Sequence, residues 1–162
     1  MSDYIHHGSG GERFHYTDCG LDNIWLTGGV ETIDTPYGKA TSIRDLDDLH
    51  CEIAKEIATN AISNGNMRGQ EFRFLRVELD LSQRALARLL HSTEQQIRRW
   101  ENDKVAIPGT AQVSLAGYYL ESMDESGRVK ELMDRYAELD ALETRAMKTF
   151  SIRDNHWGPD AA

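Results

Sequence analysis

Cysteine is scarce in this chain, and long apolar runs are missing. The 162 residues contain only two cysteines, Cys19 and Cys51, which is too few for a disulfide framework or a four-cysteine zinc site. A reducing cytoplasm is therefore the expected compartment. No apolar run has the length of a membrane span, and we expect no signal peptide at the N-terminus. With 40% hydrophobic residues, a chain of this length can bury one good core or two small ones.

An excess of positive charge is missing as well, because 27 acidic residues outnumber 18 basic ones and the net charge is −9. This balance argues against a protein that coats nucleic acid through charge alone. The distribution is uneven, however. From Arg68 to Lys104, eight basic residues face six acidic ones, so this segment carries +2 and the remainder −11. Because salt screens charges beyond about 8–10 Å, the local positive charge is what a nearby ligand meets.

The most informative segment, residues 81–101, reads LSQRALARLLHSTEQQIRRWE. It predicts two short amphipathic helices joined by a three-residue turn. Ser82 and Thr93 are residue types that cap helix N-termini. Ile97 and Trp100, three residues apart, are expected to point into the core. This pattern is typical of a helix-turn-helix, whose second helix enters the major groove of DNA.

The second of these helices carries polar side chains that suit DNA. Gln95 and Arg99 are four residues apart and share a helix face, so we expect both to contact base edges. We expect Gln83, Thr93 and Arg98 to contact phosphates. The complete predicted DNA-binding set is Gln83, Thr93, Glu94, Gln95, Gln96, Arg98 and Arg99. The alternative is a generic helical hairpin with a polar face that does not bind DNA.

These residues resemble the Cro/repressor-type (Xre) helix-turn-helix family of transcriptional regulators. The matching elements are Leu81–Gln83, Leu86, Ala87, Ile97, Arg99–Glu101 and Lys104, with Glu71–Leu79 upstream and Ile107–Pro108 downstream. The resemblance covers roughly residues 67–121. The family usually has glycine where His91 stands and an apolar residue where Ser92 stands. We therefore expect a modified turn with a positive φ at His91.

The region before Asn64 has a different pattern. Short β-branched or aromatic runs predict strands at 13–16, 23–26, 30–34 and 39–43. The turns between them are predicted at Cys19–Gly20, Gly28–Gly29 and Pro36–Gly38. A helix is expected to follow, capped by Asp45, with one apolar face made by Leu46, Leu49, Ile53, Ile57 and Ala61.

Residues 14–26, together with Thr35–Gly38 and the helix that starts at Asp45, resemble the front half of MqsA-like antitoxin-type regulators. In the zinc-binding members, two Cys-x-x-Cys pairs hold the metal there. Here Cys19 and Cys51 have no partner cysteines, so this half resembles a degenerate zinc-binding domain. The resemblance implies a protein partner, a toxin, for the front half.

A mixed zinc site made by His15, Cys19, His50 and Cys51 is the alternative to two free thiols. The neighbouring side chains of His50 and Cys51 would point about 100° apart on a helix, which suits one tetrahedron poorly. We therefore expect no metal and no cofactor. The acidic stretch from Asp45 to Glu56 is more typical of a solvated helix face than of a cation site. No catalytic motif is present, and the chain is not expected to be an enzyme.

The sequence predicts an α+β fold. A flexible N-terminus (1–12) precedes a small β-rich domain with one helix (13–64), and an all-α helix-turn-helix domain of about five helices follows (67–121). A C-terminal helical extension is expected at 127–152. Its apolar stripe, at Val129, Leu132, Tyr136 and Leu139, predicts either a homodimer interface or a contact with the chain's own core.

Two functional classes remain. The first is a sequence-specific DNA-binding transcriptional regulator, a dimeric repressor or autoregulator that could be the antitoxin of a toxin–antitoxin pair. The second is a protein-interaction module that neutralises or adapts a partner, with the helix-turn-helix as a scaffold. Double-stranded DNA and a basic toxin-like protein are the expected partners, and no membrane is expected. RNA is disfavoured, because exposed aromatic pairs for base stacking are not evident.

Overall fold

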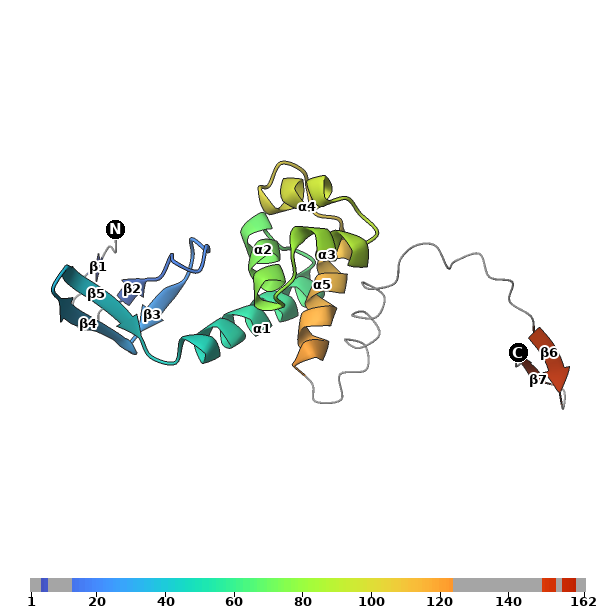
Figure 1. Ribbon diagram of the computed structural model, residues 1–162, viewed down its shortest axis with the longest axis horizontal. Helices are drawn as coiled ribbons and strands as arrows, with labels where there is room; N and C mark the ends of the chain where they lie inside the picture. Colours follow the sequence, from blue (N-terminus) through green and yellow to red (C-terminus); the bar gives the residue numbers. More distant parts are fainter. Residues whose placement is uncertain (1–3, 6–12, 124–149, 154–155, 160–162) are drawn as a thin grey trace.

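The computed structural model describes residues 4–5, 13–123, 150–153 and 156–159 (Figure 1). The strands are β1 (Tyr4–Ile5), β2 (Arg13–His15), β3 (Trp25–Thr27), β4 (Val30–Thr35), β5 (Gly38–Ile43), β6 (Phe150–Arg153) and β7 (His156–Pro159). The helices are α1 (Leu46–Asn64), α2 (Gly69–Glu78), α3 (Gln83–Leu89), α4 (Glu94–Glu101) and α5 (Gly109–Ser122). The predicted α+β class is confirmed: small antiparallel sheets precede a helical body.

The helix α1 is the central packing element of the helical body. It runs below α2 in the view of Figure 1, crosses α5, and packs against both helices. Its inner face consists largely of small side chains, and Ala54, Ala58 and Ala61 are fully buried. Small residues at these positions let α5 approach closely and bring Leu115 and Ala116 into the same core. The body of five helices therefore consists of α1 together with the four helices that follow it.

The hydrophobic core crosses the predicted boundary between 13–64 and 67–121. Leu21, which lies in the loop before β3, is only 2% exposed and belongs to the same cluster as Phe72, Ile97 and Leu115. Met67, on the connection between α1 and α2, is also buried in this cluster. The segment 16–24 is therefore packed as part of the helical body.

Polar contacts fasten this segment to the helices. The Tyr16 hydroxyl lies 2.8 Å from Nε2 of His50 on α1, and Nδ1 of His50 lies 3.0 Å from Glu78 at the end of α2. Arg68 donates to Asp22 at 2.7 Å and to Asn23 at 2.9 Å. Hydrogen bonding to Arg68 lowers the pKa of Asp22, so its carboxylate stays ionised. These contacts fix where the N-terminal loop meets the start of α2.

The hairpin β4–β5, unlike the segment 16–24, is largely exposed to solvent. Its two strands pair in register from Val30 with Ile43 to Thr35 with Gly38, but most of its side chains are exposed. Ile33 is 49% exposed and Tyr37, at the tip, is fully exposed. Gly38 has φ +120°, a conformation that only glycine adopts without strain, which explains the tight return of the chain there. The four predicted strands and the turns between them are confirmed, with small shifts at their ends.

Two sequence predictions need correction. Asp45 precedes α1 as expected, but it has φ +50° and its side chain makes no capping hydrogen bond. The predicted helix at 127–152 is wrong at its end, because Phe150–Arg153 form β6 and pair with β7. A backbone in a strand ladder cannot also supply the last turn of a helix. The rest of that predicted helix, with its apolar stripe, lies outside the described residues, and so do the other residues of 1–12 around β1.

Leu21→Ala should destabilise the whole helical body, because it removes a side chain from the common core. The expected loss is about 2–5 kcal/mol in the free energy of unfolding, as for other buried leucines. The control Ile33→Ala changes an exposed hairpin residue and should cost about 0.5 kcal/mol or less. Urea unfolding followed by helical circular dichroism measures both. An unchanged midpoint for Leu21→Ala would show that the segment 16–24 unfolds separately from the helices.

Candidate nucleic-acid interface

The helices α3 and α4 form the predicted helix-turn-helix, and each begins with the predicted cap. The Ser82 hydroxyl accepts a hydrogen bond from the backbone N–H of Ala85 at 3.0 Å. The Thr93 hydroxyl accepts from the N–H of Gln96 at 3.1 Å. Both cap residues have extended backbone angles, as a cap requires. Each cap satisfies an N–H group that the first turn of a helix leaves unpaired.

The turn after α3 shows why His91 can replace the expected glycine. His91 has φ +50°, as the sequence predicted. Its N–H donates to the carbonyl of Arg88 at 3.2 Å, and the N–H of Ser92 donates to the carbonyl of Ala87 at 2.8 Å. These two bonds define a Schellman motif, which ends a helix with one left-handed residue. Asp80 after α2 and Asp103 after α4 occupy the same position in equivalent motifs.

The helix α4 separates a buried face from an exposed one. Ile97 is fully buried and Trp100 nearly so, and Trp100 packs edge-on against Phe72. Gln95 and Arg99 are exposed. Within the described part of the chain, the side chains of Gln95 and Arg99 make no hydrogen bond or ion pair, so their donors and acceptors are available. Polar groups at this spacing on one face can reach adjacent base edges in the major groove.

The other predicted contacts on α4 have local partners. Arg98 pairs with Glu94 at 3.4 Å, four residues earlier on the same helix. Both side chains are exposed, so this pair is weak and a phosphate could replace Glu94 as the partner of Arg98. Gln96 is half-buried and lies beside the exposed face, and the Thr93 hydroxyl remains engaged in the cap.

A buried ion pair holds α4 against the two preceding helices. Nε of Arg76 on α2 lies 2.5 Å from Oε1 of Glu101, whose side chain is only 2% exposed. Nη1 of Arg76 donates to the carbonyl of Leu81 at 2.7 Å. The side-chain amide of Gln83 on α3 donates to Oε2 of Glu101 at 2.7 Å. One carboxylate on α4 is thus bound by both α2 and α3.

This network was not predicted from the sequence, and it bears on two predicted roles. It leaves Arg99 available, because the partner of Glu101 is Arg76. The amide of Gln83 is held inside the network, so a phosphate contact through this side chain would compete with Glu101. The backbone N–H groups at the start of α3 offer a different route to phosphate.

Gly69 is a second residue whose role the sequence did not reveal. A Cβ atom added at this position would lie 2.5 Å from the carbonyl oxygen of Trp100, so only glycine lets α2 begin against the end of α4. The N–H of Gly69 donates to Oδ1 of Asp103 at 2.8 Å. The first turn of α2 and the last turn of α4 are therefore joined.

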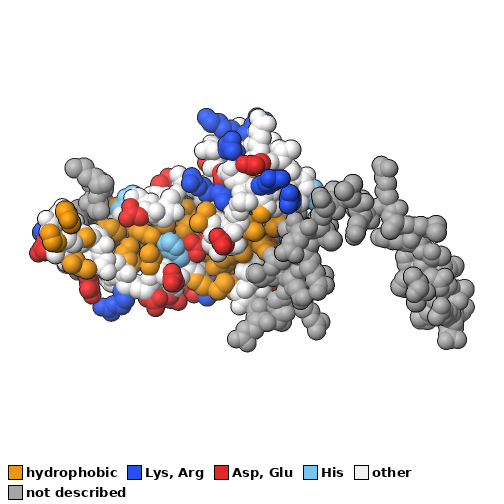
Figure 2. All heavy atoms as spheres, viewed as in Figure 1, with side chains coloured by type: hydrophobic (Ala, Val, Ile, Leu, Met, Phe, Trp, Pro, Cys, Tyr) orange, Lys and Arg blue, Asp and Glu red, His pale blue; other side chains and the backbone are white. Residues whose placement is uncertain are grey.

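Basic side chains gather over this part of the molecule. On the face drawn in Figure 2, Lys and Arg cluster over the region where Figure 1 places α2 to α4. The exposed basic residues from α2 to the turn that follows α4 are Arg73, Arg84, Arg88, Arg98, Arg99 and Lys104. The local excess of positive charge expected from the sequence is thus on the surface, where phosphates can approach it.

The four candidate zinc ligands are engaged in other contacts or lie as free thiols. His15 bonds to the carbonyl of Asp22 at 2.8 Å and stacks on Trp25, while both ring nitrogens of His50 contact Tyr16 and Glu78. Cys19 and Cys51 are free. Burial raises the pKa of the Cys19 thiol, which disfavours the thiolate that binds zinc. Among the described residues, no group of three or more potential ligands is close enough to hold a metal.

One comparison with known proteins matches the helices that form this surface. The family model described as Helix-turn-helix matches residues 72–124, which span α2 from Phe72 to the end of α5. The match indicates a helix-turn-helix over these residues and supports a DNA-binding transcriptional regulator in general. No curated protein and no solved structure is significantly similar to the chain. Among the described helices, none has the length and apolar content needed to cross a bilayer.

Arg76→Met should destabilise the helix-turn-helix by about 3–5 kcal/mol, because it leaves the Glu101 carboxylate buried without a cation. The double variant Arg76→Met/Glu101→Met removes both charges and should recover a large part of this loss. As a control, Arg98→Met breaks only the exposed pair with Glu94 and should cost about 1 kcal/mol or less. Chemical denaturation measures all three. Equal losses for the single and double variants would show that the unpaired carboxylate is not the cause.

Proposed function

We propose that this protein is a sequence-specific DNA-binding repressor or autoregulator that reads the major groove with α4. The observation that carries this proposal is the exposed pair Gln95 and Arg99 on a helix fixed by the buried Arg76–Glu101 pair. A scaffold helix needs no unpaired Gln and Arg on one outer face, whereas base recognition needs this arrangement.

The remaining predicted residues surround these two. Arg98 and Thr93 are exposed and can contact phosphates. The backbone N–H groups at the start of α3, where Gln83 lies, can bind phosphate as well. Gln96 and Glu94 lie at the margin of the reading face, where they limit which bases fit. The acidic residues of the N-terminal half keep that half away from phosphate.

Arg99→Ala should weaken binding to the chain's own site by about 1–3 kcal/mol and change binding to random DNA little. Arg98→Ala should instead weaken both about equally and reduce the salt dependence. Arg44→Ala is the matched control, because Arg44 is exposed, pairs with Glu31 and lies in the N-terminal half. The site is obtained by selection from random duplexes with the full chain, and titrations at two salt concentrations follow. Equal losses for Arg99→Ala on both DNAs would make Arg99 a phosphate contact.

We further propose that the protein binds as a homodimer. One helix-turn-helix reads only a few base pairs, and high affinity comes from two half-sites about one helical turn apart. The apolar stripe of the C-terminal segment (Val129, Leu132, Tyr136 and Leu139) has the three-and-four spacing of a helical interface.

The full chain should sediment as a dimer and a chain ending at residue 126 as a monomer. The truncation removes the stripe and leaves α1 to α5 complete, because α5 ends at Ser122. Helical circular dichroism of the shortened chain serves as the folding control. A dimer that survives the truncation would place the interface elsewhere.

A second role rests on the N-terminal half. We infer that this half binds a basic protein partner, as an antitoxin binds its toxin. On α1, Asp47, Asp48, Glu52 and Glu56 are exposed, and the basic Lys55 among them is already paired with Glu52 at 2.6 Å. Charge of one sign accelerates encounter with a partner of the other sign and disfavours DNA. In the alternative function, this contact is the main activity and the helix-turn-helix is a scaffold.

A further inference from the structure

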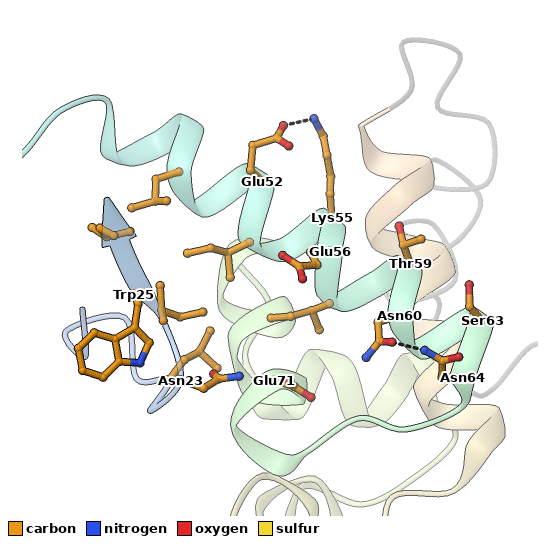
Figure 3. Close-up of a pocket in the computed structure, with 16 residues that line it drawn as sticks. Asn23, Trp25, Glu52, Lys55, Glu56, Thr59, Asn60, Ser63, Asn64 and Glu71 are labelled. Carbon is orange, nitrogen blue, oxygen red and sulfur yellow. Dashed lines mark hydrogen bonds and ion pairs between the residues drawn. The ribbon is translucent and has the colours of Figure 1, made fainter. Parts of the chain in front are cut away.

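A groove of about 950 Å³ lies between α1 and the segment that leads into β3 (Figure 3). One wall carries Asn23 and Trp25, and the other is formed by α1 with Glu52 and Glu56. The apolar residues that line it, called the floor below, are Leu21, Ile24, Leu26, Leu49, Ile53 and Ile57. This groove lies outside the face of α4 that we assign to DNA.

The floor is only partly covered by the protein itself. Ile24, Leu49 and Ile57 pack against the common core but are only half-buried. Trp25 stacks on His15 at the margin and is still 42% exposed. Apolar surface that stays in contact with water next to a large exposed aromatic ring is typical of a site that a partner covers.

The charges around this floor are not all satisfied. Glu52 is paired with Lys55, and Glu71 accepts the N–H of Arg68 at 2.8 Å. Glu56 has no ion pair within the described part of the chain, although it points into the groove beside the apolar floor (Figure 3). A carboxylate beside apolar surface favours an occupant that brings its own cation.

We propose that this groove binds a basic amphipathic helix of a protein partner, with apolar side chains on the floor and Lys or Arg against Glu52 and Glu56. An apolar groove between polar walls is how proteins bind such helices. The proposal rests on the partner-binding role inferred above and names its site. DNA binding does not depend on it.

Charge favours a basic partner helix over two other candidate occupants of the groove, which are the C-terminal segment of this chain and a second copy of it. Residues 124–149 of this chain contain seven acidic and five basic residues, so the wall acids oppose them. A second copy carries a net charge of −9, and its basic surface is the one that DNA occupies. A basic segment of another protein has neither conflict.

The test uses the full chain with Trp157→Phe, so that Trp25 reports on the groove while the buried Trp100 stays constant. The probe is a synthetic peptide of about 18 residues, or five helical turns, with leucines on one face and lysines elsewhere. A matched peptide has glutamates in place of the lysines. The lysine peptide should shift Trp25 emission to the blue and bind saturably, and the glutamate peptide should not bind.

Variants distinguish the groove from general acidity. Glu52→Gln/Glu56→Gln should weaken the lysine peptide about 3–10-fold, since each exposed ion pair contributes modestly. The control Glu31→Gln/Asp34→Asn removes the same charge from the hairpin β4–β5 and should leave the affinity unchanged. Ile57→Thr should weaken binding through the floor, with thermal unfolding as its folding check.

Four outcomes would overturn the proposal. Equal losses of affinity for the lysine peptide in the groove and hairpin variants would mean that overall charge alone attracts the peptide. Equal binding of the lysine and glutamate peptides would mean that charge does not determine which peptide binds. Loss of the dimer on sedimentation of Glu52→Gln/Glu56→Gln would assign the groove to a second copy. Operator affinity of the parent Trp157→Phe chain is measured in parallel. Intact DNA binding by that chain without binding of the lysine peptide rejects the groove and leaves the DNA-binding function standing.

Discussion

The ion pair between Arg76 and Glu101 is the interaction on which the position of α4, and with it the proposed DNA-binding surface, depends. A carboxylate with a side chain 2% exposed is stable only when cations and donors surround it, and here Arg76 and Gln83 supply them from two other helices. The Glu101 carboxylate cannot separate from these partners unless water enters the helix-turn-helix to solvate it. The position of α4 is therefore set by electrostatics as well as by the packing of Ile97 and Trp100.

The N-terminal half is not a separate domain, because part of it helps to hold the helices together. Leu21 fills the core beneath the helices, and Arg68 ties Asp22 and Asn23 to the start of α2. The hairpin β4–β5 takes no part in this core and stands apart with most of its side chains in water. The chain thus combines one packed body with an exposed β hairpin. The groove lies between α1 and the segment that leads into β3, and no residue of the hairpin β4–β5 is among those that line it.

Local chemistry accounts for what could be predicted from the sequence. Ser82, Thr93 and His91 act within a few residues of their own positions, so their roles as caps and turn could be predicted and are confirmed. The same holds for the four strands, whose alternation and turns are local signals. The outer face of α4 was predicted by helical periodicity, and its contacts with DNA stay predictions.

Contacts between distant residues account for what was missed. Arg76 and Glu101 are 25 residues apart, and Leu21 meets helices more than 30 residues further along the chain. Nothing in the immediate neighbourhood of Gly69 indicates that the end of α4 lies against it. The cap expected at Asp45 failed for the opposite reason, because the preceding hairpin delivers the chain at φ +50°, where the side chain does not reach the first turn.

The bond between Gly69 and Asp103 has an energetic consequence for recognition. It closes α2, α3 and α4 into a ring, because the segment that begins at Gly69 returns to it at Asp103. A ring of short helices held at both ends has few alternative arrangements, so α4 is preorganised for the role in DNA binding that we propose. Little conformational entropy then remains to be lost when the duplex arrives, and more of the contact energy appears as affinity.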